Sequence, residues 1–391
     1  MKKFFFSLLW DCNENCLFCA KGKAPEGVKR RFSMSECAAM LRKKRLEGCD
    51  AVSLDGGEPT LLDYLPDVIR TASGLGYSQI HLLTNAVALS SPEKVAAIKR
   101  APGPAGRLKR LGVCVSLHSH ERRISETLTR SSGTFEKTVL GIRNLVSAGI
   151  HTTVYHLITS LNYRALPAFA DFVINGLRGV GGVTFSHIYP ASRKAENLRL
   201  YPRLSKVAPH LSRAAEKLRA KGLEVSMSNC GIIPVCLMGG CETLFTDTVI
   251  DNNISSETCD TSKTESLPFF MELFNKRNKT KPPSCAACAL NPVCGGIWKF
   301  YAERRGTAEL KPYSRKDMLG LPASGGTAAL AFKKDPGWED PASALLVRLL
   351  DLRYRGFDKA KIKGFKGEAA ARTAAVRKFA RNIGFSRITF H

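Results

Sequence analysis

The chain of 391 residues is long enough for one large domain and a smaller one. It has 59 Lys and Arg against 34 Asp and Glu, a formal net charge of +25, and no segment approaches the length of a membrane span. The basic residues are spread along the whole chain, which favours a solvated basic surface over a clustered site for nucleic acid.

Cysteine usage indicates the redox environment. The chain has 13 cysteines, an odd number, and several stand at tight C-x-x-C spacings. In a reducing compartment such spacings predict metal or redox sites rather than disulfides. A secreted disulfide scaffold would be shorter and poorer in apolar residues, so a cytoplasmic location is expected.

The first predicted element is an apolar run that ends at three cysteines, FFFSLLWDCNENCLFCAKG at residues 4–22. A signal peptide is one interpretation, because Lys2 and Lys3 precede the run. No small-residue cleavage site follows it, since Trp10 and Asp11 stand where one would be needed. The run instead predicts a buried β-strand that delivers the cysteines to the loop at its carboxyl end.

Strand-like runs alternate with stretches of helical period through the first half of the chain. The predicted strands are 4–10, 51–54, 79–83, 112–117, 151–158 and 182–188. The predicted helices include 35–47, 66–73, 92–99, 135–148 and 166–175. Six strand–helix repeats in order predict an α/β fold, a partial TIM-like (β/α)6 barrel with parallel strands and outer helices. Active residues are expected in the loops that follow the strands.

The pattern changes after about residue 190, where cysteines return in two groups separated by a polar stretch at 247–264. The elements predicted there are a helix at 211–221, a strand at 223–228, a linker at 321–332, a short helix at 345–357 and a basic helical tail at 358–381. The predicted domains are a barrel at 1–195, a cysteine-rich domain at 196–313 and a basic C-terminal extension at 314–391.

Cys12, Cys16 and Cys19 form the pattern C-x-x-x-C-x-x-C. Three thiolates at this spacing can ligate one face of a cubane iron–sulfur cluster and leave one iron without a protein ligand. A metal site that performs chemistry needs such an open position. Zinc is the alternative, but a structural zinc site would need a fourth close Cys or His, and none follows before Cys37. The spacing therefore favours the cluster.

A glycine-rich turn, SLDGGEPTLL at 53–62, follows the second predicted strand. Gly56 and Gly57 can let the backbone approach a ligand closely, and Glu58 offers a carboxylate to an ammonium group. A Gly-Gly-Glu turn alone is a weak signal, because Gly-Gly turns are common. Its place one βα unit after the cysteine loop makes the combination specific.

These features closely resemble the radical S-adenosylmethionine (SAM) enzymes over residues 4–190. The shared features are the cysteine pattern with an aromatic before its last cysteine, here Phe18, the Gly-Gly-Glu turn and the partial barrel. The resemblance implies a [4Fe–4S] cluster whose open iron binds the amino and carboxylate groups of SAM. It also implies that an electron from the cluster cleaves the sulfonium and releases a 5′-deoxyadenosyl radical, which abstracts hydrogen from a substrate.

The resemblance assigns roles to individual residues. It implies that the three N-terminal cysteines ligate the cluster and that Gly57 and Glu58, next to Gly56, hold the amino group of SAM. The polar residues expected near the SAM carboxylate and ribose are Thr84, Ser116 and Arg130. An ordinary polar strand end is the alternative for the first two. The chain departs from the family pattern at Ala86, where glycine is frequent, and at His118, where an acidic residue is common.

A second cysteine set, CAACALNPVCGGIWKFYAERRG, contains Cys285, Cys288 and Cys294. A zinc knuckle is the alternative on spacing alone. The segment resembles the auxiliary-cluster domains called SPASM or Twitch but lacks the further cysteine of the fuller pattern, which implies one auxiliary [4Fe–4S] cluster. Cys236 is the expected fourth ligand. The competitors for that place are Cys230, Cys241 and Cys259. The cysteines expected to be small buried hydrophobes are Cys37, Cys49 and Cys114.

The predicted function is that of a radical SAM enzyme that modifies a substrate at an unactivated C–H position. The auxiliary-domain resemblance favours a peptide or protein substrate, and a flavodoxin or ferredoxin is the expected electron donor. A tRNA- or nucleotide-modifying enzyme of the same superfamily is the alternative, motivated by the net charge and the basic tail. A non-catalytic iron–sulfur or zinc protein is the alternative of another class, and no membrane partner is expected.

Overall fold

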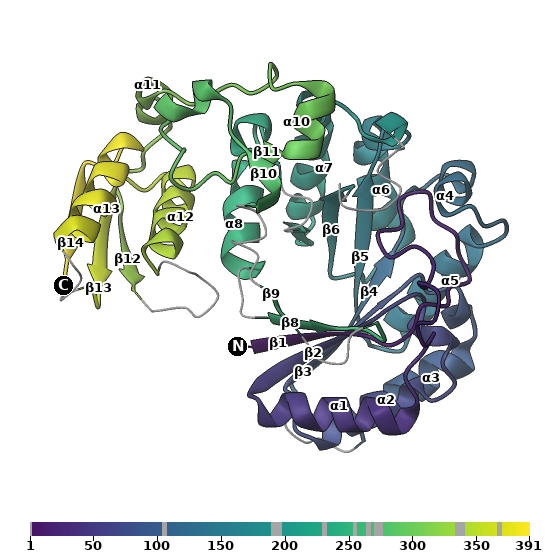
Figure 1. Cartoon of the computed structure of the whole chain (residues 1–391). Helices are drawn as coiled ribbons and strands as arrows, with labels where there is room; N and C mark the ends of the chain where they lie inside the picture. Colours follow the sequence, from purple (N-terminus) through teal and green to yellow (C-terminus); the bar gives the residue numbers. More distant parts are fainter. Residues whose placement is uncertain are drawn as a thin grey trace. The chain divides into compact units, whose positions relative to one another are not determined.

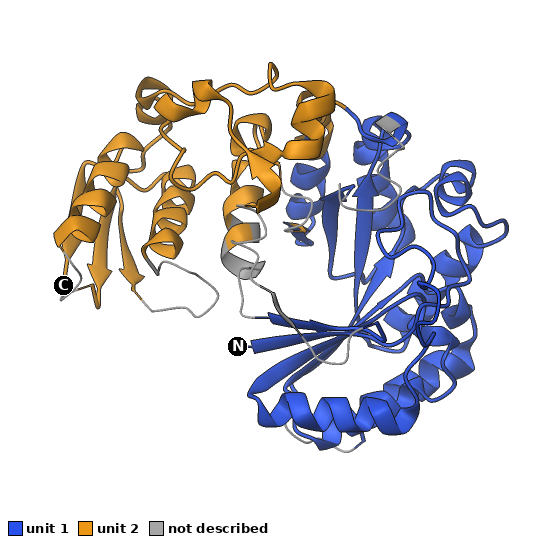
Figure 2. Ribbon diagram, viewed as in Figure 1, with its two compact units in different colours: residues 1–202, 213–226, 255–269 blue, residues 203–212, 227–254, 270–391 orange. Residues whose placement is uncertain are grey.

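The computed structural model describes residues 2–103, 108–188, 198–228, 233–252, 256–262, 267–269, 277–332, 341–365 and 370–391. The chain divides into two compact units, shown in Figure 2. Unit 1 comprises residues 1–202, 213–226 and 255–269, and unit 2 comprises residues 203–212, 227–254 and 270–391. Among the described helices, none has both the length and the apolar character needed to span a membrane.

Unit 1 is built on one sheet with the strand order β7-β6-β5-β4-β3-β2-β1-β8-β9 (Figure 1). Its strands are β1 (Lys2–Ser7), β2 (Cys49–Asp55), β3 (Gln79–Thr84), β4 (Arg110–Ser116), β5 (His151–Ile158), β6 (Gly182–His187), β7 (Glu224–Met227), β8 (Ser256–Cys259) and β9 (Leu267–Phe269). β1 to β6 pair in parallel, and β8 joins β1 in parallel. In the described residues this order is linear, which confirms the predicted partial barrel.

The helices of unit 1 lie in the crossovers between its parallel strands. They are α1 (Met34–Leu46), α2 (Leu65–Gly74), α3 (Pro92–Arg100), α4 (Arg122–Thr129), α5 (Phe135–Ser147) and α6 (Leu166–Gly176). After β6 follows α7 (Leu204–Ala220), which belongs to unit 2 up to Ser212 and to unit 1 from Arg213. α1 begins at a capping box, in which the Ser33 hydroxyl accepts from Glu36 N and the Glu36 carboxylate accepts from Ser33 N. The crossovers bring the carboxyl ends of β1 to β6 to one edge of the sheet, where the loops can form a site.

β1 lies inside the sheet, between β2 and β8. Phe4 and Phe6 are fully buried and their rings stack at a centroid distance of 5.1 Å. Burial of each aromatic side chain contributes about 1.5–3 kcal/mol to folding. The strand predicted at 4–10 is therefore confirmed, although it begins and ends earlier in the chain.

β8 falls within the stretch at 247–264 that the sequence marks only as polar. Its Glu257 is nearly buried and accepts a hydrogen bond from Lys44 Nζ of α1 at 2.6 Å. This buried ion pair joins α1 to the strand beside β1. The strands β7, β8 and β9 thus complete the sheet of unit 1 from beyond residue 195.

Unit 2 contains α8 (Glu242–Asn252), α10 (Lys299–Arg305), α11 (Arg315–Leu319) and a short antiparallel pair, β10 (Lys279–Thr280) and β11 (Ile297–Trp298). Its C-terminal part is a parallel sheet in the order β12-β13-β14, with helices in the crossovers (Figure 1). These elements are β12 (Thr327–Ala331), α12 (Pro341–Tyr354), β13 (Lys359–Lys363), α13 (Ala370–Asn382) and β14 (Arg387–Phe390). The predicted linker at 321–332 is wrong at β12, and the predicted helical tail contains a strand as well as a helix.

Arg353 of α12 is a buried cation that connects three segments of unit 2. Its side chain is 2% exposed, and its guanidinium donates hydrogen bonds to four backbone carbonyls. The acceptors are Ile383 O (3.0 Å), Pro322 O (2.7 Å), Met318 O (3.2 Å) and Leu321 O (2.6 Å). Removal of the guanidinium takes this donor from three carbonyls, while Met318 O still accepts from Leu321 N at 3.4 Å, and each unsatisfied carbonyl costs at least about 1 kcal/mol.

We therefore expect Arg353→Met to destabilise unit 2 by about 3 kcal/mol. The control is Arg355→Met, which removes one exposed ion pair to Asp351 (2.8 Å) and should cost at most about 1 kcal/mol. The measurement is proteolysis of the full chain across a urea series. Equal urea midpoints for the two variants would contradict the role given to Arg353.

Candidate metal centres

The loop after β1 carries the first cysteine set and is anchored to the end of α4. Asn15 N donates a hydrogen bond to Thr129 O at 3.0 Å, and Leu17 N donates to Leu128 O at 2.8 Å. The two donors flank Cys16 in the sequence. Main-chain hydrogen bonds to α4 therefore fix the conformation of the loop around this cysteine.

Cys12, Cys16 and Cys19 line one cavity of about 670 Å³. Burial raises the pKa of Cys12 to about 11, and burial together with the Glu14 carboxylate raises the pKa of Cys16. Three thiols from one loop that face one cavity are a donor set that fits an iron–sulfur cluster with three protein ligands. Across the part of the chain that the structure describes, no three His, Cys, Asp or Glu side chains are grouped to hold a single metal ion.

The Gly-Gly-Glu turn after β2 packs against the cysteine loop. Gly57 N donates to Leu9 O at 2.7 Å, and Glu58 N donates to Asp11 O at 2.8 Å. A Cβ on Gly57 would lie 1.9 Å from Asp11 O. A Cβ on Gly56, whose φ is +146°, would lie 2.6 Å from Leu9 O. Both glycines also line the cavity, so their close approach to the loop shapes the cavity wall.

The carboxylate of Glu58 is buried and joins the ends of β2 and β3. Its Oε1 accepts hydrogen bonds from the Thr60 and Thr84 hydroxyls, both at 2.6 Å, and from Thr60 N at 3.0 Å. Its Oε2 accepts from Asn85 N at 2.7 Å. Burial raises the pKa of this carboxyl, and the hydrogen bonds oppose the rise. Glu58 and Thr84 thus organise the strand ends, and their contacts to SAM stay predictions.

Asn85 is a residue of this site that the sequence analysis did not single out. Its side-chain nitrogen donates to Asn13 Oδ1 at 2.7 Å and lies 4.0 Å from Cys12 Sγ. The available signal was its position directly after Thr84, at the carboxyl end of a parallel strand, where functional side chains collect. Asn85 therefore links the end of β3 to the cysteine loop.

The cavity wall carries both signs of charge. The charged residues that line it are Asp11, Glu14, Lys21, Lys23 and Arg30. Burial raises the pKa of Glu14 to about 7, and its carboxylate lies 3.6 Å from Cys16 Sγ. Arg30 Nε donates to Asp11 Oδ1 at 2.7 Å. A ligand with both an ammonium and a carboxylate group would meet partners of each sign here.

The other predicted contacts lie on β4 and after α4. Ser116 is half-buried at the carboxyl end of β4, opposite Tyr155 of β5. Arg130 is exposed and ends α4 with a left-handed backbone, at φ +52°. Neither residue lines the cavity that the three cysteines share. Their contacts to SAM stay predictions.

His118 lies in the loop after β4 and is buried. Its Nδ1 accepts a hydrogen bond from Leu157 N at 3.1 Å, and its ring meets the Phe18 ring at a centroid distance of 4.7 Å. Burial lowers its pKa to about 3, so the imidazole is neutral at physiological pH. His118 thus packs beside the aromatic residue that precedes Cys19.

The second cysteine set lies in unit 2, where Cys236, Cys285, Cys288 and Cys294 line one small cavity. The first of these comes from the 3-10 helix at Val235–Leu237, and the others come from the segment that leads to β11. Burial raises the pKa of Cys236 to about 11 against the effect of a backbone hydrogen bond, and the three other thiols raise it further. Four thiols around one cavity fit a cluster with four protein ligands.

The other cysteines considered as the fourth ligand of the auxiliary cluster either do not line this cavity or lie outside the described residues. Cys241 donates to Met238 O at 2.7 Å and does not line this cavity. Cys259 is buried in β8 of unit 1, and Cys230 falls outside the described residues. Among these candidates in the described residues, Cys236 is the one that lines the same cavity as Cys285, Cys288 and Cys294.

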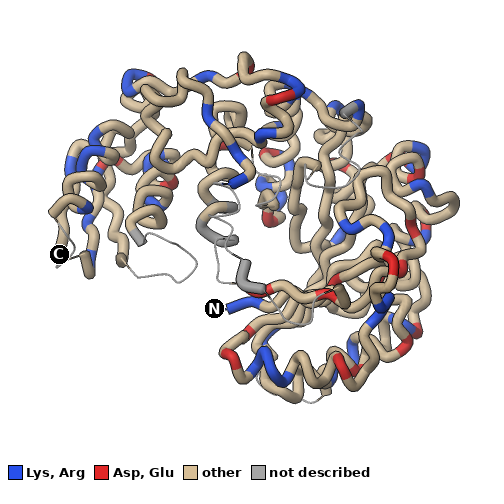
Figure 3. Tube along the Cα trace, in the orientation of Figure 1, with Lys and Arg blue, Asp and Glu red and all other residues tan. Residues whose placement is uncertain are grey.

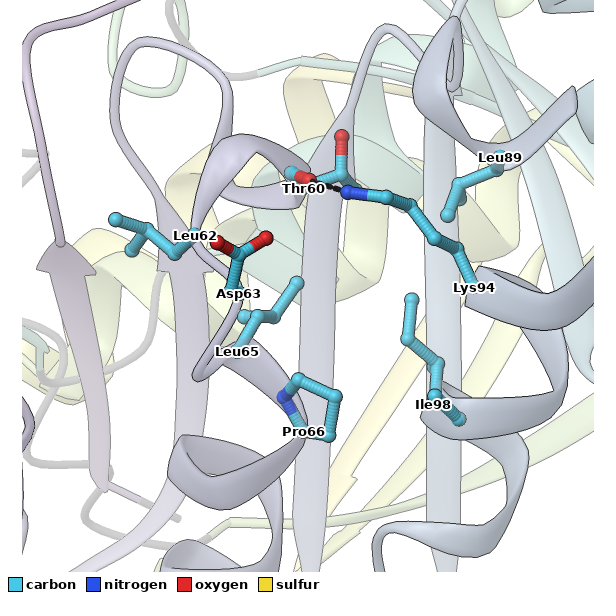
Figure 4. Close-up of a pocket in the computed structure, with 9 residues that line it drawn as sticks. Thr60, Leu62, Asp63, Leu65, Pro66, Leu89, Lys94 and Ile98 are labelled. Atoms are coloured by element: carbon cyan, nitrogen blue, oxygen red, sulfur yellow. Dashed lines mark hydrogen bonds between the residues drawn. The ribbon is translucent and has the colours of Figure 1, made fainter. Parts of the chain in front are cut away.

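A further cavity, of about 150 Å³, lies beside the start of α2 and α3 (Figure 4). Its wall is largely apolar, and Lys94 Nζ donates across it to Thr60 O at 3.2 Å. Asp63 supplies its carboxylate group. This wall contains no cysteine or histidine, so it offers no comparable metal-binding donor set.

Comparison with known proteins supports the pattern at the first cysteine set. The family model described as the radical SAM superfamily matches residues 11–173. A probable GTP 3′,8-cyclase of Sulfurisphaera tokodaii is 25% identical over 214 residues, which cover 54% of this chain and 63% of the relative. A protein of the same description from Methanopyrus kandleri is 28% identical over 42% of this chain and 50% of its own length. The chain thus matches less than two thirds of the length of each of these relatives.

Solved structures share the fold. SuiB of Streptococcus suis, bound to S-adenosylmethionine, aligns with a TM-score of 0.55 at 12% identity, over 80% of this chain and 76% of SuiB. SuiB bound to the precursor peptide SuiA aligns with a TM-score of 0.52 at 14% identity, over 72% and 62% of the two chains. At this identity the likeness shows the fold alone.

Proposed function

We propose that this chain, whose residues 11–173 belong to the radical SAM superfamily, is an enzyme that cleaves SAM reductively to start radical chemistry on a substrate. The observation that carries the proposal is the convergence of Cys12, Cys16 and Cys19 on one cavity that is also lined by Gly56 and Gly57. Enzymes of this superfamily use a [4Fe–4S] cluster and SAM, and three thiols that line one cavity fit the cluster.

In this proposal the three cysteines hold the cluster and the glycine-rich turn supports the ligand beside it. A bound cluster and SAM supply a one-electron reduction of the sulfonium and the 5′-deoxyadenosyl radical that follows. The mixed charge of the wall suits the amino and carboxylate groups of SAM, with Glu14 placed to accept from the ammonium and Lys23 to donate to the carboxylate. Asn85 holds the loop through Asn13 and so keeps Cys12 in place.

The test is anaerobic reconstitution of the full chain with iron and sulfide, followed by dithionite and SAM. We expect 5′-deoxyadenosine as a product, detected by chromatography and mass spectrometry. A reconstituted, iron-loaded protein that leaves SAM intact would support the non-catalytic alternative. Flavodoxin or ferredoxin in place of dithionite tests the proposed electron donor.

We assign an auxiliary [4Fe–4S] cluster to Cys236, Cys285, Cys288 and Cys294, because all four line one cavity. A cluster with four thiolate ligands has no open iron, so it would relay electrons or hold the unit together rather than bind substrate directly.

This assignment predicts the iron content of variants. Cys236→Ala is expected to lower bound iron after reconstitution from about eight to about four atoms per chain, because one of two cubanes is lost. The matched control is Cys241→Ala, which removes a thiol that does not line the cavity. Iron lost from the Cys241 variant but retained by the Cys236 variant would reverse the choice of ligand.

A peptide or protein is the proposed substrate. The support is the shared fold with SuiB, whose structure was solved with a precursor peptide, and the auxiliary-domain pattern around Cys285. The second candidate is a nucleotide, favoured by the sequence similarity to probable GTP 3′,8-cyclases. Incubation with SAM and candidate substrates, followed by detection of deuterium transferred into 5′-deoxyadenosine from labelled substrate, separates the two.

A further inference from the structure

The C-terminal sheet of unit 2 presents a row of lysines on one face of its central strand. Along β13 the residues alternate, with Ala360 and Ile362 buried and Lys361 and Lys363 exposed. Lys359 is half-exposed and lies on the same face as the other lysines, since side chains of a strand alternate between its two faces. This period of two places three ammonium groups along one strand.

The two outer strands extend this face. Pairing places Thr327, Ala329 and Ala331 of β12 beside the three lysines, in the same order. On the other side, Arg387 of β14 pairs with Lys359, and Thr389 pairs with Lys361. The neighbours are thus small or hydroxylated, apart from one more cation, and none of these residues is Asp or Glu. We call these eight residues the lysine face.

The opposite face of the sheet is covered by helices. The Arg377 side chain of α13 lies over the Phe390 ring at 5.2 Å, and the Phe365 and Phe390 rings lie 5.1 Å apart. Val376 and Phe379 of α13 are buried. Because this apolar side forms the core, the lysine face is the other, exposed side of the sheet, and Figure 3 shows where Lys and Arg fall along the chain trace.

The chemistry of the lysine face fits a chain of phosphates. Alternate residues of a strand are about 6.6–6.8 Å apart, so the lysines form a regular row of point charges. Small alanine and threonine side chains beside the row let a bulky backbone approach. The face has no large apolar side chain to anchor a peptide, and peptide binding usually relies on a groove, a pocket or a strand edge. The hydroxyl of Thr327 can pair with a ribose 2′-hydroxyl group, which DNA lacks, and the hydroxyl of Thr389 lies 3.1 Å from His391 Nε2.

We propose that the lysine face binds the sugar–phosphate backbone of a single RNA strand, independently of base sequence. This inference goes beyond the proposed function, since it concerns a partner of the C-terminal sheet and not the cysteine cavities. His391 N donates to Ile362 O and His391 O accepts from Gly364 N, so the row of lysines has one imidazole beside Lys363, and phosphate contacts supply most of the affinity and make it depend on salt.

The test measures binding of a short fluorescein-labelled single-stranded RNA to the full chain by anisotropy over a series of KCl concentrations. The variant replaces Lys359, Lys361 and Lys363 by glutamine. Because three phosphates then have no ammonium partner, the slope of log affinity against log salt should become shallower by about 2. The matched control K316Q/K378Q/R381Q removes the same charge from exposed positions on α11 and α13, and its slope should stay near that of the unchanged chain.

Three outcomes would overturn the proposal. An equal decrease of affinity in both variants would mean a diffuse effect of net charge. Equal affinity for DNA of the same sequence would remove the assignment to RNA, and displacement of RNA by polyglutamate at matched charge would make the face an acidic-peptide site. Formation of 5′-deoxyadenosine is measured on the same samples, so failure of RNA binding is distinguishable from failure of the proposed enzyme activity.

Discussion

The Cys16→Ala variant is expected to form no detectable 5′-deoxyadenosine under conditions in which the unchanged chain forms it. Cys16 is the middle thiol of the three that line the cavity, and its loop is held to α4 through Asn15 and Leu17 on either side. Two thiols leave a cubane with two irons unligated by protein, so the cluster is lost or displaced. The measurements are iron content and 5′-deoxyadenosine after anaerobic reconstitution.

The matched control is Cys37→Ala. Cys37 is fully buried in α1, and burial raises its pKa to about 12, as expected for an inert core thiol. This variant should keep both the iron and the product. If the Cys16 variant formed as much 5′-deoxyadenosine as the Cys37 variant, the proposed cluster site would be wrong.

The Gly57→Ala variant is expected to lose about 100-fold in the rate of 5′-deoxyadenosine formation, although it removes no ligand. The added Cβ would lie 1.9 Å from Asp11 O, which belongs to the backbone and cannot rotate away. The cysteine loop must shift, and a displacement of about 1 Å at a reacting centre can cost a factor of 10² in rate. Overpacking of this kind also costs about 1–3 kcal/mol in stability.

The control for this prediction is Gly74→Ala. Gly74 is the last residue of α2, and a Cβ placed there meets no atom within 4 Å. Any general effect of removing a glycine should appear in both variants, whereas displacement of the cysteine loop should appear in the Gly57 variant alone. Equal rates for the two variants would show that the loop tolerates the shift.

The barrel strands could be predicted from the sequence because they are long apolar runs with helical patterns between them. The C-terminal sheet could not, for a physical reason visible in β13. Its sequence KAKIK has the period of two that is typical of a half-buried strand. Ala and Lys are also strong helix formers, so the composition of this stretch predicts a helix instead. β12 has the sequence TAALA, whose five mostly small residues resemble a linker more than a strand.

The part of the candidate site that could be predicted is the part whose residues are close together in the sequence. Cys12, Cys16 and Cys19 are close in sequence and therefore close in space. Asn85 and Glu14 depend on how strand ends and loops meet, which one sequence does not reveal. Cys236 is the fourth ligand expected from the sequence, and the fold adds that it lies within the 3-10 helix at Val235–Leu237 and lines the second cavity, which Cys241 does not line.

The place of β1 between β2 and β8 has a consequence for biosynthesis. Its partner β8 leaves the ribosome only after most of the chain has been translated, so one edge of this apolar strand stays bare on the nascent polypeptide. Bare apolar edges recruit other strands and promote aggregation. An expression fragment that stops at residue 195 would keep that edge permanently open, and the strand that carries the thiol loop would have no neighbour on that side.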